Sequence, residues 1–148
     1  MPVISGVPQG TVFGPIFFLL YVNDVDINIK HSKINSFADD TRISKRISTM
    51  DDCSLLQEDL EYVIEWSKEN NMMLHEDKFE LLSYRTPASK TTAEALPFMA
   101  DVNSYTTSNG TTLERSYLVR DLGVNMSEEL SWSPHINIMV DQASQIAS

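Results

Sequence analysis

The sequence predicts an α+β fold in which helices alternate irregularly with antiparallel hairpins. Three observations favour this class. Two short apolar runs, at 34–37 and 41–44, flank the polar tip Ala38-Asp39-Asp40, which is typical of a hairpin. Apolar residues at helical spacing predict one long helix after Thr49, and Asn109-Gly110 is a strong two-residue turn signal between strands. No internal repeat is present, so the elements are expected to form an irregular α+β arrangement.

The length and composition are those of about one globular domain. The 148 residues are 42% hydrophobic and 22% charged, which is too apolar for an intrinsically disordered chain. The net charge of −10 argues against a protein that coats nucleic acid in general, because phosphate binding needs Lys and Arg. The longest apolar run, Ile16 to Val22, is too short for the roughly 20 residues that span a bilayer, so no membrane partner is expected.

The single cysteine, Cys53, excludes a disulfide framework and any multi-cysteine zinc site. No disulfide partner is therefore expected. A reducing, intracellular setting fits this composition, and both the nucleus and the cytoplasm stay open.

The first third contains a loop and an apolar helix ahead of the hairpin. Residues 5–14 are rich in Gly and Pro and predict a loop. Pro15 suits the first turn of a helix, where its missing N–H is not needed. Residues 16–25 are apolar on nearly all sides, so we expect this helix to be buried.

The middle third is dominated by the long helix. Thr49-Met50-Asp51-Asp52 resembles a capping box that begins it, and Asn70-Asn71 can end it. Acidic residues fall largely between the apolar positions, so we expect them to face solvent. The apolar positions are Leu55, Leu56, Leu60, Val63 and Ile64, and the acidic ones are Asp59, Glu61, Glu65 and Glu69. Residues 79–84 then predict a strand and residues 86–97 a linker.

The last third predicts further hairpins and a closing helix. Asn109-Gly110 is expected to join strands near 101–107 and 112–120, and residues 121–124 to begin another short strand. Ser133-Pro134 is expected to cap the last helix. One face of that helix is apolar, formed by Ile136, Met139, Val140, Ala143 and Ile146.

Asp39-Asp40 is the leading candidate for chemistry. In a regular strand the two carboxylates would point to opposite faces, but at a hairpin tip both can face one side. Such a tip can hold Mg²⁺, which takes one or two carboxylates together with substrate phosphates. The alternative is an ordinary Asp-rich turn, because Asp suits turn geometry.

The basic residues of the first third form a second candidate feature. Residues 1–50 hold four acidic and five basic side chains, whereas the whole chain is strongly acidic. If any part meets a polyanion, it is this part, and the alternative is a solvated surface with scattered charge. The cluster consists of Lys30, Lys33, Arg42, Lys45 and Arg46, with His31 nearby.

Two motifs together carry a resemblance to a known family. Residues 5–15, followed by 17–24, resemble the B motif of reverse transcriptases of the non-LTR retrotransposon type, especially the jockey-like group. Phe37-Ala38-Asp39-Asp40 resembles the C motif of that family and follows in the expected order. The combination of both motifs at this spacing is highly specific.

The resemblance continues along nearly the whole chain and implies a partial polymerase palm leading into the start of a thumb. Residues 56–78 are similar to the family's D region, 118–124 to the E hairpin that grips the primer, and 130–136 to the stretch entering the thumb. The implied organisation is a palm part over 1–85, a loop and hairpin over 86–112, a primer-grip-like E region over 113–133 and the start of a thumb helix over 134–148.

The resemblance also implies residue roles. Asp39 and Asp40 match the carboxylates associated with two catalytic Mg²⁺ ions, and Lys78 matches a lysine that protonates the pyrophosphate leaving group. The implied partners are an RNA template, a DNA primer and dNTPs. The nucleotide- and template-binding positions are Pro8, Gln9, Gly10 and Phe37, and those of the primer grip are Leu122 and Gly123.

The implied function is template-directed nucleotidyl transfer by a two-metal mechanism. In the family a third carboxylate, in the A motif, lies before the B motif, and no Asp here can be assigned to it. We therefore expect residues 1–148 alone to be inactive in primer extension. A non-catalytic RNA- or protein-binding remnant of a retroelement is the alternative. A further alternative is a related polymerase, such as a group II intron maturase or a telomerase subunit. The B motif and residues 118–136 resemble the jockey-like group more than these polymerases.

Overall fold

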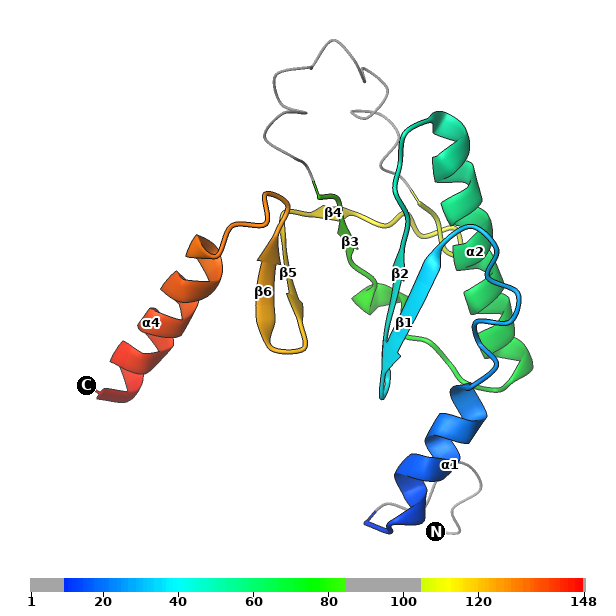
Figure 1. Ribbon diagram of the computed structural model, residues 1–148, viewed down its shortest axis with the longest axis horizontal. Helices are drawn as coiled ribbons and strands as arrows, with labels where there is room; N and C mark the ends of the chain where they lie inside the picture. The colour runs from blue at the N-terminus through cyan, green and yellow to red at the C-terminus, as the bar shows by residue number, and fades with distance from the viewer. Residues whose placement is uncertain (1–9, 85–104, 148) are drawn as a thin grey trace. The chain divides into compact units, whose positions relative to one another are not determined.

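The computed structural model describes residues 10–84 and 105–147. They form helices and small two-stranded sheets (Figure 1), which agrees with the predicted α+β class. The chain divides into two compact units, Met1–Leu74 and His75–Ser148, and each is described by itself. Among the described residues, no helix combines the length and the apolar character that crossing a membrane requires.

The first unit consists of two helices and one hairpin. In chain order these are α1 (Phe13–Val22), β1 (Lys33–Phe37), β2 (Asp40–Ser44) and α2 (Met50–Glu69). β1 and β2 are antiparallel, with Lys33 opposite Ser44 at one end and Phe37 opposite Asp40 at the other. The predicted hairpin is therefore confirmed, and the hairpin runs beside α2 in Figure 1.

The core of the first unit lies between α2 and the hairpin. Val63 and Trp66 of α2 are buried together with Val25 from the segment after α1. Ile34 of β1 and Ile43 of β2, which are cross-strand neighbours, pack against this cluster. Each fully buried apolar side chain of this size stabilises the fold by roughly 1.5–3 kcal/mol, so this contact is what holds the hairpin on α2.

α2 begins and ends where the sequence predicts. The Thr49 hydroxyl accepts the Asp52 N–H at 3.3 Å, and the Asp52 carboxylate accepts the Thr49 N–H at 3.0 Å, which is a complete capping box. The Asp52 carboxylate also accepts the Ser48 N–H at 2.9 Å, and this bond is the main reason that the pKa of Asp52 is lowered. The helix ends at Asn70, and Asn71 follows with a φ of 54°.

The prediction that the first helix is buried is wrong. α1 begins at Phe13, ahead of the expected residue 16, with Pro15 in its first turn as predicted. Its apolar side chains are largely exposed, with 59% of Leu19 and 69% of Leu20 accessible to solvent. The described residues cover one side of α1 only, where Val22 joins the core and the Tyr21 ring meets the Trp66 ring at 6.5 Å.

The expectation that the acidic residues of the long helix face solvent is wrong for one of them. Asp59 is only 2% exposed, whereas Glu61, Glu65 and Glu69 are exposed as expected. Asp59 shares a helical stripe with Val63 and Trp66, at spacings of four and seven residues, so it lies on the buried face of α2.

The second unit has short strands and one helix. Its elements are η1 (Glu76–Lys78), β3 (Leu81–Leu82), β4 (Arg115–Ser116), β5 (Leu118–Asp121), β6 (Val124–Ser127) and α4 (Ser133–Ala147). β5 and β6 form an antiparallel hairpin, and α4 begins at the predicted Ser133-Pro134. Arg115 of β4 pairs with Glu128, directly after β6, and so ties β4 to the hairpin.

Two strand predictions in the second unit need correction. The strand expected over 79–84 is reduced to β3, and it pairs in parallel with β4, a long-range contact that no local pattern signals. The expected two-residue turn at Asn109-Gly110 is wrong in position: the turn centres on Ser108 and Asn109, with the Gly110 N–H donating to the Thr107 carbonyl at 2.9 Å, and its flanks form a single bridge between Thr106 and Thr112. The expected linker over 86–97 and strand residues 101–104 lie outside the described residues.

Candidate functional site

The exposed end of the β1–β2 hairpin carries the two candidate metal-binding carboxylates. Phe37 pairs with Asp40, so Ala38 and Asp39 alone make the turn and Asp40 is the first residue of β2. Ala38 has a φ of 53°, in the left-handed region that costs an L-residue with a Cβ about 1–2 kcal/mol. Strained backbone of this kind concentrates at functional sites. The hairpin therefore holds Asp39 and Asp40 at a tight, strained tip.

Asp39 and Asp40 are both exposed. Within residues 10–84 and 105–147, neither carboxylate has an ion pair or a hydrogen bond. Two adjacent negative charges attract a cation from solution. The tip is therefore open to a metal ion or to the metal-bound phosphates of a substrate.

The strands that lead to the tip are held by core packing and by a cross-strand hydrogen bond. Ile34 and Ile43 anchor them to the core, as described above. One residue pair below the tip, the hydroxyls of Ser36 and Thr41 meet across the strands at 3.1 Å. Phe37, at the end of β1, is 67% exposed and forms an apolar surface next to the carboxylates. The arrangement is a rigid arm that presents two carboxylates and one aromatic ring.

The donor set at the tip suits Mg²⁺ in type. Mg²⁺ prefers oxygen ligands, and usually takes one or two carboxylates while water and substrate phosphates complete its shell. No cluster of three or more His, Cys, Asp or Glu residues that could hold a metal occurs among the described residues. Asp39 and Asp40 thus fit one such ion together with a phosphate, and a two-ion centre would require further ligands.

The other predicted site residues of the first unit lie before α1. Gly10 has a φ of 77°, a conformation that glycine adopts without strain. The nearby Thr11 hydroxyl accepts the Gly14 N–H at 3.1 Å and so satisfies a donor at the start of α1. Pro8 and Gln9 lie outside the described residues.

The remaining predicted site residues belong to the second unit. Lys78 is the last residue of η1 and is exposed. Leu122 and Gly123 make the two-residue turn of the β5–β6 hairpin with φ values of 47° and 85°, as a type I′ turn requires. These residues belong to a different unit from Asp39 and Asp40.

Asp59 is a positioning residue that the sequence interpretation missed. Its carboxylate accepts the Lys30 N–H at 3.1 Å and the His31 N–H at 3.0 Å, just before β1 begins. Burial raises the pKa of this carboxyl, but the two backbone donors, with Ser32 and the charge of His31, outweigh burial and lower the pKa overall. The spacing of Asp59 to Val63 and Trp66 was the signal that could have revealed it.

Asp24 is a second missed residue. The Trp66 indole Nε1–H donates to its carboxylate at 3.1 Å, across 42 residues of sequence. Asp24 lies at the end of the motif over residues 17–24, so one acidic residue of that motif fastens the segment after α1 to the core. A buried indole N–H usually needs such an acceptor.

Comparisons with known proteins point to one family. The family model described as "Reverse transcriptase (RNA-dependent DNA polymerase)" matches residues 1–126. The protein named "RNA-directed DNA polymerase from mobile element jockey", from Drosophila melanogaster, is 24% identical over 143 residues, which cover 91% of this chain. The chain spans 14% of the length of that relative. No solved structure matches the chain.

Proposed function

Because the chain belongs to the reverse transcriptase (RNA-dependent DNA polymerase) family, we propose that it forms part of the palm of a jockey-like, non-LTR RNA-directed DNA polymerase. The observation that carries this proposal is the exposed Asp39-Asp40 pair at the tip of the β1–β2 hairpin, inside the matched residues. Among the described residues neither carboxylate has an ion pair. The reaction of the complete enzyme is addition of a nucleotide to a DNA primer along an RNA template.

In this proposal the hairpin tip is the catalytic end of the palm. Bound Mg²⁺ would lower the charge on the triphosphate and favour ionisation of the primer 3′-hydroxyl, as metal ions do in phosphoryl transfer. Asp39 and Asp40 hold the metal-binding oxygens in place, because the strands behind them are anchored by Ile34 and Ile43. Phe37 borders the incoming nucleotide.

The other proposed roles follow the motif positions. Lys78 gives a proton to the departing pyrophosphate, and Leu122 and Gly123 support the primer at the tip of the β5–β6 hairpin. The loop containing Pro8, Gln9 and Gly10 positions the nucleotide and the template. In the same organisation residues 1–85 are palm, 113–133 carry the primer grip and α4 is the start of the thumb.

We further propose that residues 1–148 alone do not extend a primer. Two-metal transfer needs ligands beyond one pair of carboxylates, and the described residues place no third acidic residue, histidine or cysteine with Asp39 and Asp40. The expected result is no Mg²⁺-dependent extension of a DNA primer on an RNA template. Extension that Asp39→Ala abolishes would refute this proposal of inactivity while supporting the catalytic role of Asp39.

A metal-binding measurement tests the hairpin tip without requiring turnover. Mn²⁺, a paramagnetic substitute for Mg²⁺, is added to the isotopically labelled chain, and loss of NMR amide signals is followed along the sequence. We expect the earliest losses at Ala38, Asp39 and Asp40. The Asp39→Asn/Asp40→Asn double variant should abolish these losses.

The chain offers an internal control for this measurement. Asp51-Asp52 is another adjacent acidic pair, but Asp52 is occupied by the capping box and lies 3.5 Å from the Lys45 ammonium. The tip should therefore lose signal at a lower Mn²⁺ concentration than this pair. Equal sensitivity of both pairs would mean that the tip is an ordinary acidic turn, and would favour the non-catalytic remnant.

A further inference from the structure

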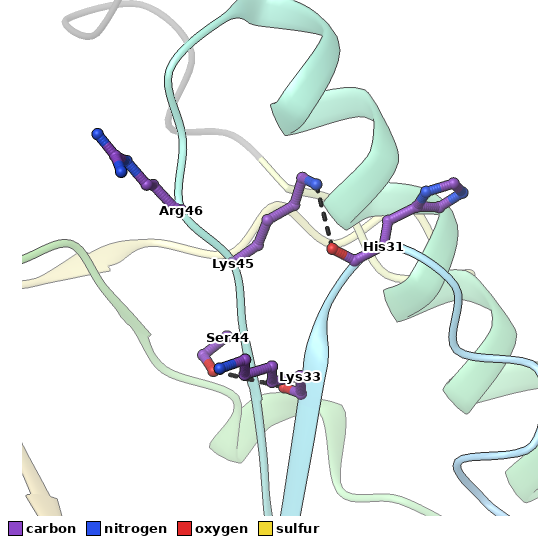
Figure 2. Close-up of a pocket in the computed structure, with 5 residues that line it drawn as sticks. All are labelled: His31, Lys33, Ser44, Lys45 and Arg46. Atoms are coloured by element: carbon purple, nitrogen blue, oxygen red, sulfur yellow. Dashed lines mark hydrogen bonds between the residues drawn. The ribbon is translucent and has the colours of Figure 1, made fainter.

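The end of the β1–β2 hairpin opposite the aspartates carries an open basic hollow. Its volume is about 420 Å³, and it is lined by His31, Lys33, Ser44, Lys45 and Arg46 (Figure 2). We call it the basal hollow. Lys33 and Ser44 are the paired residues at the base of the two strands, so the hollow is built on the hairpin that carries Asp39 and Asp40.

Part of the hollow is a fixed wall. The Lys45 ammonium donates to the His31 carbonyl at 3.1 Å, which Figure 2 shows as a bridge between the two sides of the hairpin base. The same ammonium lies 3.5 Å from an Asp52 carboxylate oxygen, and its side chain is only 12% exposed. The Asp59 carboxylate of α2 accepts the N–H groups of Lys30 and His31. The wall is therefore tied to α2 at two points.

Two cationic side chains of the hollow are accessible to a ligand. Lys33 and Arg46 are exposed, and neither has an acidic partner in the part of the chain that the structure describes. The Arg46 guanidinium extends away from the strands in Figure 2. Since the chain as a whole carries −10, two unpaired cations beside a wall of neutralised charge form a local site for an anion.

The lining residues indicate what kind of anion fits. Lys and Arg are the usual phosphate ligands, and a Ser hydroxyl is a common further donor to phosphate oxygens. The hollow contains no Phe, Tyr or Trp and no carboxylate or amide side chain, and three of its five lining residues are Lys or Arg. The site therefore suits backbone phosphates.

We propose that the basal hollow binds the phosphodiester backbone of a nucleic-acid strand, through Lys33 and Arg46. Ser44 comes four residues after Asp40 in β2, so the hollow lies about 14 Å from the tip at roughly 3.4 Å per strand residue. This contact is separate from the proposed catalytic tip. Binding at the basal hollow does not depend on the proposed function. Whether the bound strand is the template or the primer does rest on that function.

The test measures binding of fluorescein-labelled oligouridylate RNA to the full chain by fluorescence anisotropy, over a range of KCl concentrations. Each phosphate contact on a single strand contributes a slope of about −0.7 in log K against log salt, or about 5-fold in affinity at 0.1 M salt. The Lys33→Gln/Arg46→Gln double variant should lose about 25-fold in affinity and about 1.4 of slope. Oligoadenylate should give the same losses.

Two control variants separate this site from a change in net charge. Lys33→Arg/Arg46→Lys keeps both charges and should bind RNA like the unmodified chain. Lys68→Gln removes one charge in the last turn of α2, at a residue that does not line the hollow, and should weaken binding less than 2-fold. Intrinsic fluorescence of the buried Trp66 reports whether each variant is folded.

Three results would overturn the proposal. The first is unchanged affinity and slope in the neutralised double variant, and the second is equal losses from Lys33→Gln and Lys68→Gln. Competition with inorganic tripolyphosphate adds a third arm. If it displaces the RNA at equal phosphate concentration, the hollow is a site for small phosphates and the strand proposal is wrong. Mn²⁺ broadening at the hairpin tip should be unaffected by Lys33→Gln/Arg46→Gln, so failure here is distinguishable from failure of the proposed function.

Discussion

Removing the Asp59 carboxylate should destabilise the first unit although Asp59 touches no proposed substrate. Asp59→Ala leaves the Lys30 and His31 N–H groups, now bonded at 3.1 and 3.0 Å, without their acceptor. An orphaned buried donor costs about 1–3 kcal/mol, and both donors are only partly buried, so the lower end applies to each. The expected loss in the free energy of unfolding is about 2 kcal/mol, which is a large share of a typical 5–15 kcal/mol.

The assay is urea unfolding followed through tryptophan fluorescence in a Trp132→Phe background, which leaves buried Trp66 as the one tryptophan, with Glu65→Ala as the matched control. Glu65 is exposed on the same helix, so its removal should change stability by less than about 0.5 kcal/mol. Similar effects of the two substitutions would refute a stabilising role for the Asp59 hydrogen bonds to Lys30 and His31. Because the pKa of Asp59 is lowered from its ordinary value of 3.8, its contribution is complete above that pH and disappears as the pH falls through the lower folded value. The difference between Asp59→Ala and the unmodified chain should therefore shrink in acid.

Three further perturbations have defined outcomes. Thr49→Ala removes the capping box of α2 and should cost about 1 kcal/mol in urea unfolding; an unchanged midpoint would contradict the cap. Gly123→Ala puts a Cβ at a φ of 85° and should cost about 1–2 kcal/mol, seen as faster amide exchange across β5 and β6, whereas unchanged exchange would contradict the type I′ turn. The exposed side chains of α1 and the open strand edges of β1 and β2 should make the chain self-associate in sedimentation velocity as its concentration rises, and a monomer with a sharp cooperative melt would count against this.

Features that depend on neighbouring residues could be predicted from the sequence. The capping box at Thr49 and Asp52 needs only a four-residue pattern. The hairpin around Ala38 and Asp39 follows from apolar runs that flank a polar pair. In each case the interaction that fixes the structure lies within a few residues.

Features that depend on distant partners could not be predicted. Asp59 is buried because it meets backbone donors 28 and 29 residues earlier, and the β3–β4 pair joins Leu81 to Arg115 in parallel. For α1 the sequence predicts too much burial. Its apolar composition indicates a buried helix, whereas the described residues cover one side only. The candidate carboxylates could be identified from sequence, but the strained φ of Ala38 beside them could not.

In the proposal for the basal hollow, local charge matters more for nucleic-acid binding than net charge does. At physiological salt the Debye length is about 8 Å, which is shorter than the roughly 14 Å between the tip carboxylates and the basal hollow. Lys33 and Arg46 therefore act on a nearby phosphate largely unopposed by Asp39 and Asp40. At about 0.01 M salt the Debye length grows to about 30 Å, and the charge of −10 is then felt at the hollow. The salt dependence of RNA binding should accordingly flatten at low salt, where repulsion by the whole chain opposes the two local cations.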